Sequence, residues 1–254
     1  MRRIALSLLL FVPLAALAEA PCKYEAPRNL SLDLAGVRAI EVELGAYDLH
    51  LRGEPGAKGL EARGRACASE QRLLDQLTVT QRREGDRVVL GIGTDRGGFS
   101  FFGGGETRLE VDVTVPAGLP VTLGVGSGDA EVAGVRELDS HVGSGDLHVR
   151  GIAGRFAISV GSGDVVADDL GSLEVGAVGS GDLKASHVRG DVRVGSIGSG
   201  DVTLRQVGGS VHADTLGSGD LDVADVGGDF SLGAKGSGDV SHQGVKGRVS
   251  VPVD

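Results

Sequence analysis

The sequence predicts an all-β protein, a right-handed parallel β-solenoid with about 18–19 residues per coil and an irregular β cap, with one short helix, at its N-terminal side. Two observations predict it. The tetrapeptide Gly-Ser-Gly-Asp occurs seven times, at spacings of 17, 18, 18, 19, 19 and 19 residues, and such a fixed period is typical of stacked repeats. In the repeat that begins at Gly198, apolar residues occupy positions 5, 7, 10, 14, 16 and 19. A spacing of two is strand periodicity, so each coil should contain two short strands.

Two strands per period could form either a meander of hairpins or the coils of a solenoid. A solenoid places every tetrapeptide directly above the preceding one, which explains why identical residues recur at one position. Crossovers between parallel strands are usually right-handed, which favours a right-handed coil. The composition agrees, because 44 glycines and only 3% aromatic residues suit a narrow interior with tight corners. We expect glycines such as Gly208 and Gly209 to supply the positive φ angles of these corners.

The N-terminus has the pattern of a secretory signal peptide, which we place at residues 1–18. A basic start precedes the apolar run Ile4–Ala18, which is shorter than the roughly 20 residues of a membrane span. A retained membrane anchor is the alternative. No other apolar run is comparable, so we expect an exported protein, periplasmic or at the cell surface, without a transmembrane segment after cleavage. Because export leads to an oxidising compartment, we predict a disulfide between the two cysteines, Cys22 and Cys67.

Residues 19–123 are expected to form a less regular β region that caps the coil. The segment Gly45–Gly53 matches Gly143–Gly151 at six of nine places, so degenerate coil turns should begin near residue 30. Further predicted elements are a short helix at about 69–77 with Ser69 as N-cap, a strand pair over 78–92, a flexible loop over 97–105 and a strand over 109–115. The repeated coil then occupies residues 124–254, continuous with the cap.

The C-terminal coil loses the inward apolar pattern. His242 and Lys235 stand where earlier repeats have apolar residues. Polar residues at an open solenoid end prevent edge-to-edge pairing. A docking site for a partner is the alternative interpretation.

Three phenylalanines lie together in a glycine-rich loop. Phe99, Phe101 and Phe102 make up half of the six phenylalanines in the chain. They either fold back over the end of the coil as a hydrophobic plug or form an exposed interaction loop that contacts a partner or a membrane surface.

The repeated aspartates would form a line along the solenoid. With coils about 4.8 Å apart, neighbouring carboxylates repel by about 1 kcal/mol in water, so they must be hydrated, hydrogen-bonded or bridged by cations. In the first interpretation each carboxylate accepts hydrogen bonds from turn N–H groups, and the protein needs no cofactor. In the alternative, Ca²⁺ lies between coils and binds carboxylate oxygens. The candidate ligands are Asp146, Asp164, Asp182, Asp201 and Asp220.

Several function classes have little support in the sequence. A net charge of −10 argues against nucleic-acid binding. No serine has the G-x-S-x-G setting of a nucleophile elbow, and the six histidines do not cluster at metal-ligand spacing. We therefore expect a protein that is not an enzyme. An enzyme acting on envelope polysaccharide is kept as a distant alternative.

The repeated Gly-Ser-Gly-Asp turns, the upstream strand Val111–Pro116 and the leader resemble the bacterial exported "putative adhesin" domains of unknown function. The resemblance covers residues 30–254 and implies a β-solenoid in the cell envelope, without catalytic residues. The expected function is that of an adhesin-like rigid scaffold for protein or surface binding, and a Ca²⁺-stabilised repeat protein is the alternative. The partner would be an unknown protein or cell-envelope component, and the oligomeric state is unknown.

Overall fold

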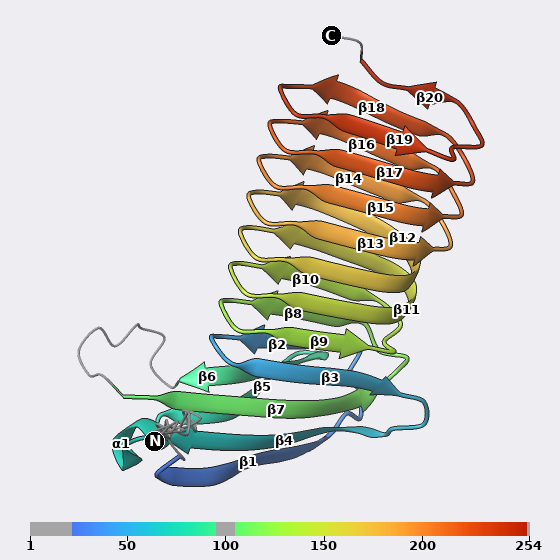
Figure 1. Ribbon diagram of the computed structural model, residues 1–254. Coiled ribbons are helices and arrows are strands. Elements are labelled where there is room, and N and C mark those ends of the chain that lie inside the picture. The colour runs from blue at the N-terminus through green and yellow to red at the C-terminus, as the bar shows by residue number, and fades with distance from the viewer. Residues whose placement is uncertain (1–21, 95–104, 253–254) are drawn as a thin grey trace, which may run out of the picture.

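The computed structural model describes residues 22–94 and 105–252, which form one continuous 20-stranded sheet wound into two faces (Figure 1). The first face contains, from the N-terminal end of the stack, β1 (Tyr24–Asp33), β4 (Gly59–Ala68), β7 (Thr107–Pro116), β3 (Asp48–Glu54), β9 (Ala130–Ala133), the first parts of β11 (Leu147–Val160) and β12 (Val165–Val178), β13 (Leu183–Val188), β15 (Val202–Val207), β17 (Leu221–Val226) and β19 (Val240–Gln243).

The second face is built in the same way. It contains β5 (Leu77–Glu84), β6 (Arg87–Thr94), β2 (Ala39–Leu44), β8 (Val121–Val125), β10 (Leu138–Val142), the second parts of β11 and β12, β14 (Val192–Ile197), β16 (Val211–Leu216), β18 (Phe230–Lys235) and β20 (Val249–Ser250). All pairings from β3 and β2 to the C-terminal end are parallel. The predicted parallel β-solenoid is therefore confirmed.

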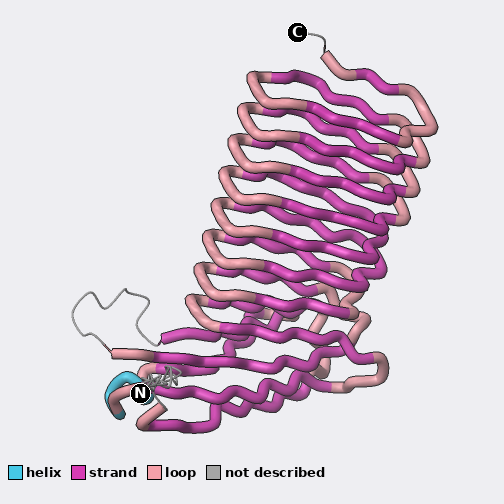
Figure 2. Tube along the Cα trace, viewed as in Figure 1, coloured by secondary structure: helices cyan, strands magenta, loops and turns pink. Residues whose placement is uncertain are grey.

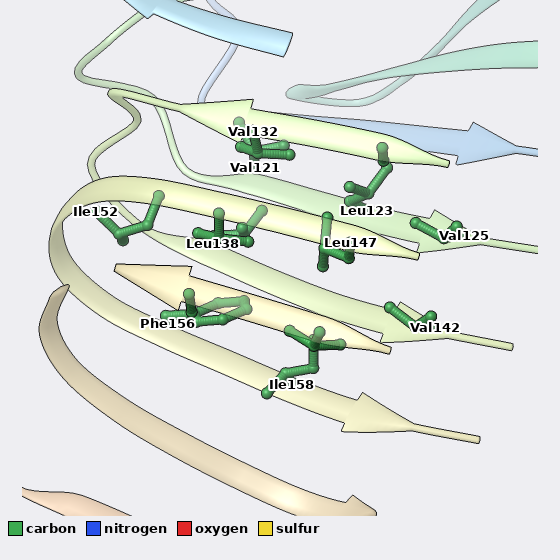
Figure 3. Packing of buried hydrophobic residues seen from close by; sticks show 14 of the residues in the cluster. Val121, Leu123, Val125, Val132, Leu138, Val142, Leu147, Ile152, Phe156 and Ile158 are labelled. Atoms are coloured by element: carbon green, nitrogen blue, oxygen red, sulfur yellow. The ribbon is translucent and has the colours of Figure 1, made fainter. Parts of the chain in front are cut away.

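The interior contains the apolar positions that the repeat predicts. In the repeat from Gly198, the side chains of Val202, Leu204, Val207, Val211, Ala213 and Leu216 are all at most 2% exposed. Figure 3 shows Leu147 of the first face and Phe156 of the second face pointing into the same narrow interior. Phe156 and Phe230 are fully buried there, so the interior holds single rings between small aliphatic neighbours. This packing confirms the prediction made from the repeat.

The Gly-Ser-Gly-Asp turns form a column along one edge of the stack (Figure 2). At the second glycine of each turn, successive backbones nearly touch. A Cβ on Gly181 would lie 1.9 Å from the carbonyl oxygen of Gly163, and a Cβ on Gly200 would lie 1.8 Å from that of Gly181. Glycine is needed here because the neighbouring coil occupies the space of a side chain.

At the opposite corner the expectation for Gly208 and Gly209 is wrong, because neither has a positive φ. A Cβ on Gly208 would lie 2.4 Å from the carbonyl oxygen of Arg189, so close approach again requires the glycine. The positive φ falls at position 9 of each repeat instead. It is held by Gly134, Gly151 and Gly244, and by the non-glycine residues Asp169, His187, Gln206 and Asp225, with φ between 53° and 58°.

The predicted degenerate coil is present, but it is stacked out of chain order. β2 pairs with both β6 and β8, and β3 pairs with both β7 and β9. The Gly45–Asp48 turn lies beneath the first tetrapeptide, where Gly128 N–H donates to the carbonyl oxygen of Gly45 at 3.1 Å. The earliest coil therefore lies between two later segments of the chain.

The capping elements differ in part from the expectation. The helix α1 (Gln71–Leu74) is shorter than predicted because Leu77, which is buried, already begins strand β5. Its N-cap is Glu70, not Ser69. The Ser69 hydroxyl instead accepts a hydrogen bond from the N–H of Glu106 at 3.1 Å. The antiparallel pair β5–β6 and the strand β7 are confirmed.

The last coil is more exposed than those before it. His242 is exposed at an inward position, and its ring lies 6.0 Å from the ring of buried Phe230, centroid to centroid. It thus covers the end of the interior, as protection of an open edge requires.

The signal peptide at residues 1–18 lies outside the described residues, and within the described part no helix is long and apolar enough to span a membrane. The division between residues 19–123 and 124–254 stays a prediction, and β8 lies across it.

Replacing Gln206 by glycine should stabilise the protein. Gln206 is exposed and holds φ of 55°, a left-handed conformation that costs a non-glycine residue about 1–2 kcal/mol. Glycine also raises the conformational entropy of the unfolded chain, which offsets part of this gain. We therefore expect a net increase of about 0.5–1 kcal/mol in the free energy of unfolding, measured by chemical denaturation. Gln206→Ala is the matched control and should show no such gain. Equal stability of the two variants would contradict the explanation.

Candidate functional site

The aspartates of the seven Gly-Ser-Gly-Asp turns, which we call the aspartate column, take part in side-chain to backbone hydrogen bonds between coils. In the first six of the seven turns, the Asp Oδ1 accepts a hydrogen bond from the N–H of the aspartate one coil later. The N···O distances are 3.1 Å for Asp129–Asp146, 3.1 Å for Asp146–Asp164, 3.0 Å for Asp164–Asp182, 3.2 Å for Asp182–Asp201, 2.9 Å for Asp201–Asp220 and 3.1 Å for Asp220–Asp239. The neighbouring turn N–H groups bond to carbonyl oxygens of the preceding coil. The carboxylate therefore supplies the acceptor that the backbone of the turn lacks at this one position.

The calcium hypothesis for Asp146, Asp164, Asp182, Asp201 and Asp220 stays a prediction. One oxygen of each of these carboxylates already accepts a backbone N–H. Among residues 22–94 and 105–252, no group of three or more His, Cys, Asp or Glu side chains could hold a metal ion.

Cys22 and Cys67 form a disulfide, with Cα atoms 5.6 Å apart. It ties the start of edge strand β1 to β4. Arg28 holds the same strand to the helix region, because its guanidinium donates to the carbonyl oxygens of Leu74 and Leu77 at 2.8 Å and 2.6 Å. The predicted interaction loop with Phe99, Phe101 and Phe102 lies outside the described residues.

Two hollows adjoin each other on the outer surface of the first face. The smaller has a volume of about 260 Å³ and lies over β3, β9, β11 and β12. The larger, of about 970 Å³, extends towards β4 and β1 and shares His50 and Arg52 with the smaller one. We call the smaller one the first-face hollow, and its polar lining consists of His50, Arg52, Glu131, His148, Arg150 and Asp168.

The parallel register arranges this lining in two rows. Glu131 lies between His50 and His148 on the neighbouring strands, and Ala133 lies between Arg52 and Arg150. The small alanine side chain leaves the space between the two arginines open. This site was not predicted from the sequence, because the three strands come together only through the out-of-order stacking of β3.

Asp168 closes the hollow on the β12 side. Its carboxylate accepts a hydrogen bond from the Ser186 hydroxyl at 2.6 Å and contacts His187 Nδ1 at 2.7 Å. The hydrogen bond from Ser186, with that from His187, lowers the pKa of Asp168 below its usual range. The carboxylate therefore stays ionised and is already engaged by these two residues.

A second histidine contact, on the second face, joins three residue types used in nucleophilic catalysis. His212 Nδ1 lies 2.8 Å from the Ser231 hydroxyl, and His212 Nε2 lies 2.9 Å from Asp214. The histidine and aspartate side chains are 52% and 64% exposed. Catalytic networks act in water-excluded sites, so this exposed contact gives no support for an active site.

The aspartate column can be tested at Asp201. Asp201→Ala should cost about 1 kcal/mol in denaturant unfolding, because the N–H of Asp220 loses its acceptor. Asp201→Asn keeps a side-chain oxygen and removes a negative charge, so it should be at least as stable as the parent. If Asp201→Asn is as damaging as Asp201→Ala, the charge is what the column needs. Melting with calcium and then with chelator would then be the test for a bound cation.

Comparison with known proteins gives a family and a fold. A family model described as Toastrack DUF4097 matches residues 60–250. No curated protein matches the chain. A solved structure described as a "putative lipid binding protein", from Parabacteroides distasonis, is 15% identical with a TM-score of 0.51, covering 90% of this chain and 98% of its own. Another, described as a "putative adhesin" from Bacteroides fragilis, is 15% identical with a TM-score of 0.50, covering 91% and 99%.

These likenesses confirm the resemblance found in the sequence, and at this identity the solved structures speak for the fold alone. The family model covers three quarters of the chain and includes every Gly-Ser-Gly-Asp turn. The chain belongs to the Toastrack DUF4097 family.

Proposed function

We propose that the protein is an exported, non-enzymatic component of the cell envelope, an adhesin-like rigid scaffold whose first face binds a protein or surface component. The observation that carries the proposal is the first-face hollow. There, side chains from β3, β9 and β11 meet in a register fixed by the backbone.

Two features support export. The sequence begins with the leader pattern at residues 1–18. The Cys22–Cys67 disulfide is typical of an oxidising compartment outside the cytoplasm. The periplasm and the cell surface both meet this condition.

Rigidity follows from the stacking. Each coil hydrogen-bonds to the next through its strands, its turn and its aspartate side chain. Outward side chains are therefore held at the strand spacing of about 4.8 Å. A partner meets a surface that is already ordered, so little conformational entropy is lost on binding.

The structural neighbours support a binding function over catalysis. They are described as a "putative adhesin" and a "putative lipid binding protein". One description concerns adhesion and the other lipid binding.

Filling the first-face hollow should abolish binding to the envelope. Ala133→Trp places a ring between Arg52 and Arg150 without changing the charge. Ala224→Trp is the matched control, because Ala224 lies on the same outward row of the first face, four coils beyond Arg150 along the stack. Purified mature protein should bind isolated envelope fragments in cosedimentation, and Ala133→Trp alone should lose that binding.

Fractionation of cells that express the protein tests whether it is exported. The mature chain should be recovered outside the cytoplasm with its disulfide formed, shown by a gel shift on reduction that Cys22→Ser lacks. Retention in the cytoplasm, or equal binding by both tryptophan variants, would contradict the proposal.

A further inference from the structure

Two arginines of the first-face hollow, Arg52 and Arg150, flank the same small residue, Ala133. Arginines elsewhere in the described residues mostly pair with carboxylates, as Arg82 does with Glu43 and Arg87 with Glu41. Among the residues that the structure describes, Arg52 and Arg150 make no hydrogen bond and no ion pair within 4.0 Å, although Arg150 lies across from Asp168 on β12. Unlike Arg205, which is also without such a partner, they share one hollow.

Arg155 on the second face shows a contrasting arrangement. Arg155 lies between acidic side chains of the coils on either side, with nitrogens 3.7 Å from Asp139 and 2.7 Å from Glu174. In the hollow the arrangement is reversed, because two arginines flank one position and that position is Ala133. The place where an acidic residue would neutralise both guanidinium groups is left open.

We infer that the first-face hollow binds a phosphate group, held between Arg52 and Arg150 above Ala133. This inference rests on the proposed function, since it names the chemistry of the ligand that the first face would bind. A phosphate monoester presents three terminal oxygens, which suits two forked guanidinium groups better than the two oxygens of a carboxylate do. The volume of about 260 Å³ is below that of pockets for drug-sized ligands, so the site takes a phosphate with a small attached group.

The acidic lining does not oppose this assignment. Asp168 is the cross-strand neighbour of Arg150, and its carboxylate is engaged by Ser186 and His187. Glu131 lies in the other row, between His50 and His148. His50 Nδ1 lies 3.5 Å from Asp112, on the side away from β9. The two guanidinium groups would therefore hold the phosphate in their own row, with Glu131 and its flanking histidines in the next.

The first measurement is a titration of the mature protein with inorganic phosphate and with glucose 1-phosphate. Binding is monitored by NMR at about 0.15 M salt, where distant charges are screened. Arg52→Ala and Arg150→Ala should each weaken binding about tenfold or more, since each removes charged hydrogen bonds. Arg205→Ala is the matched control, because Arg205 is exposed, unpaired among the described residues and in the same outward row. It should leave the affinity unchanged.

The sharper variant supplies the missing acidic residue. Ala133→Glu places a carboxylate between the two arginines, so it should abolish phosphate binding while the melting temperature stays equal to or above that of the parent. Ala224→Glu makes the same change away from the hollow and should bind normally. Unchanged binding by Ala133→Glu, or equal losses in Arg205→Ala and Arg150→Ala, would overturn the assignment.

A vesicle experiment identifies the source of the phosphate. Binding to phosphatidic acid in phosphatidylcholine vesicles, but not to glucose 1-phosphate, would assign a lipid headgroup, and the reverse would assign a soluble or glycan phosphate. Failure of every phosphate probe overturns the inference. If Ala133→Trp still loses envelope binding in that case, the proposed function stands with a different ligand.

Discussion

The close contact between successive Gly-Ser-Gly-Asp turns is the constraint on which the rest of the structure depends. The second glycine of each turn lies so near the carbonyl oxygen of the turn below that no Cβ fits. This spacing lets the turn N–H groups reach backbone acceptors one coil away, and it leaves one N–H that only the aspartate side chain can satisfy. The tetrapeptide is therefore a hydrogen-bonding unit, and its acidic residue follows from the backbone geometry.

The same spacing determines the interior and the surface. Coils held at the strand distance bring each inward residue onto its counterpart, so the interior fills with stacked small aliphatic side chains and room remains for single rings at Phe156 and Phe230. Outward residues are aligned just as strictly. A change of one residue in an outward row, such as alanine between Arg52 and Arg150, therefore creates a defined hollow. Outward residues can thus change from coil to coil without disturbing the packing of the core.

Much of this was predictable from the sequence, because the repeat is local and its period is nearly constant. The buried positions of the repeat from Gly198 and the disulfide partners agree with the structure. The positive φ predicted for Gly208 and Gly209 was wrong. Glycine is needed either for a positive φ or for a close approach of two backbones, and composition cannot separate these two uses. The first-face hollow was also out of reach. The match of Gly45–Gly53 to Gly143–Gly151 aligns Arg52 with Arg150, but it does not show that both segments pack on β9, which depends on β3 inserting between β7 and β9.

The central claim is tested most directly by two glycine-to-alanine changes compared in denaturant unfolding. A Cβ on Gly181 would lie 1.9 Å from the carbonyl oxygen of the turn below, whereas a Cβ on Gly124 would meet nothing within 4 Å. Gly181→Ala should destabilise the protein by about 2–3 kcal/mol, as overpacking does. Gly124→Ala should be neutral or stabilising by up to about 1 kcal/mol. If Gly181→Ala is tolerated as well as Gly124→Ala, the contact between turns does not constrain the fold.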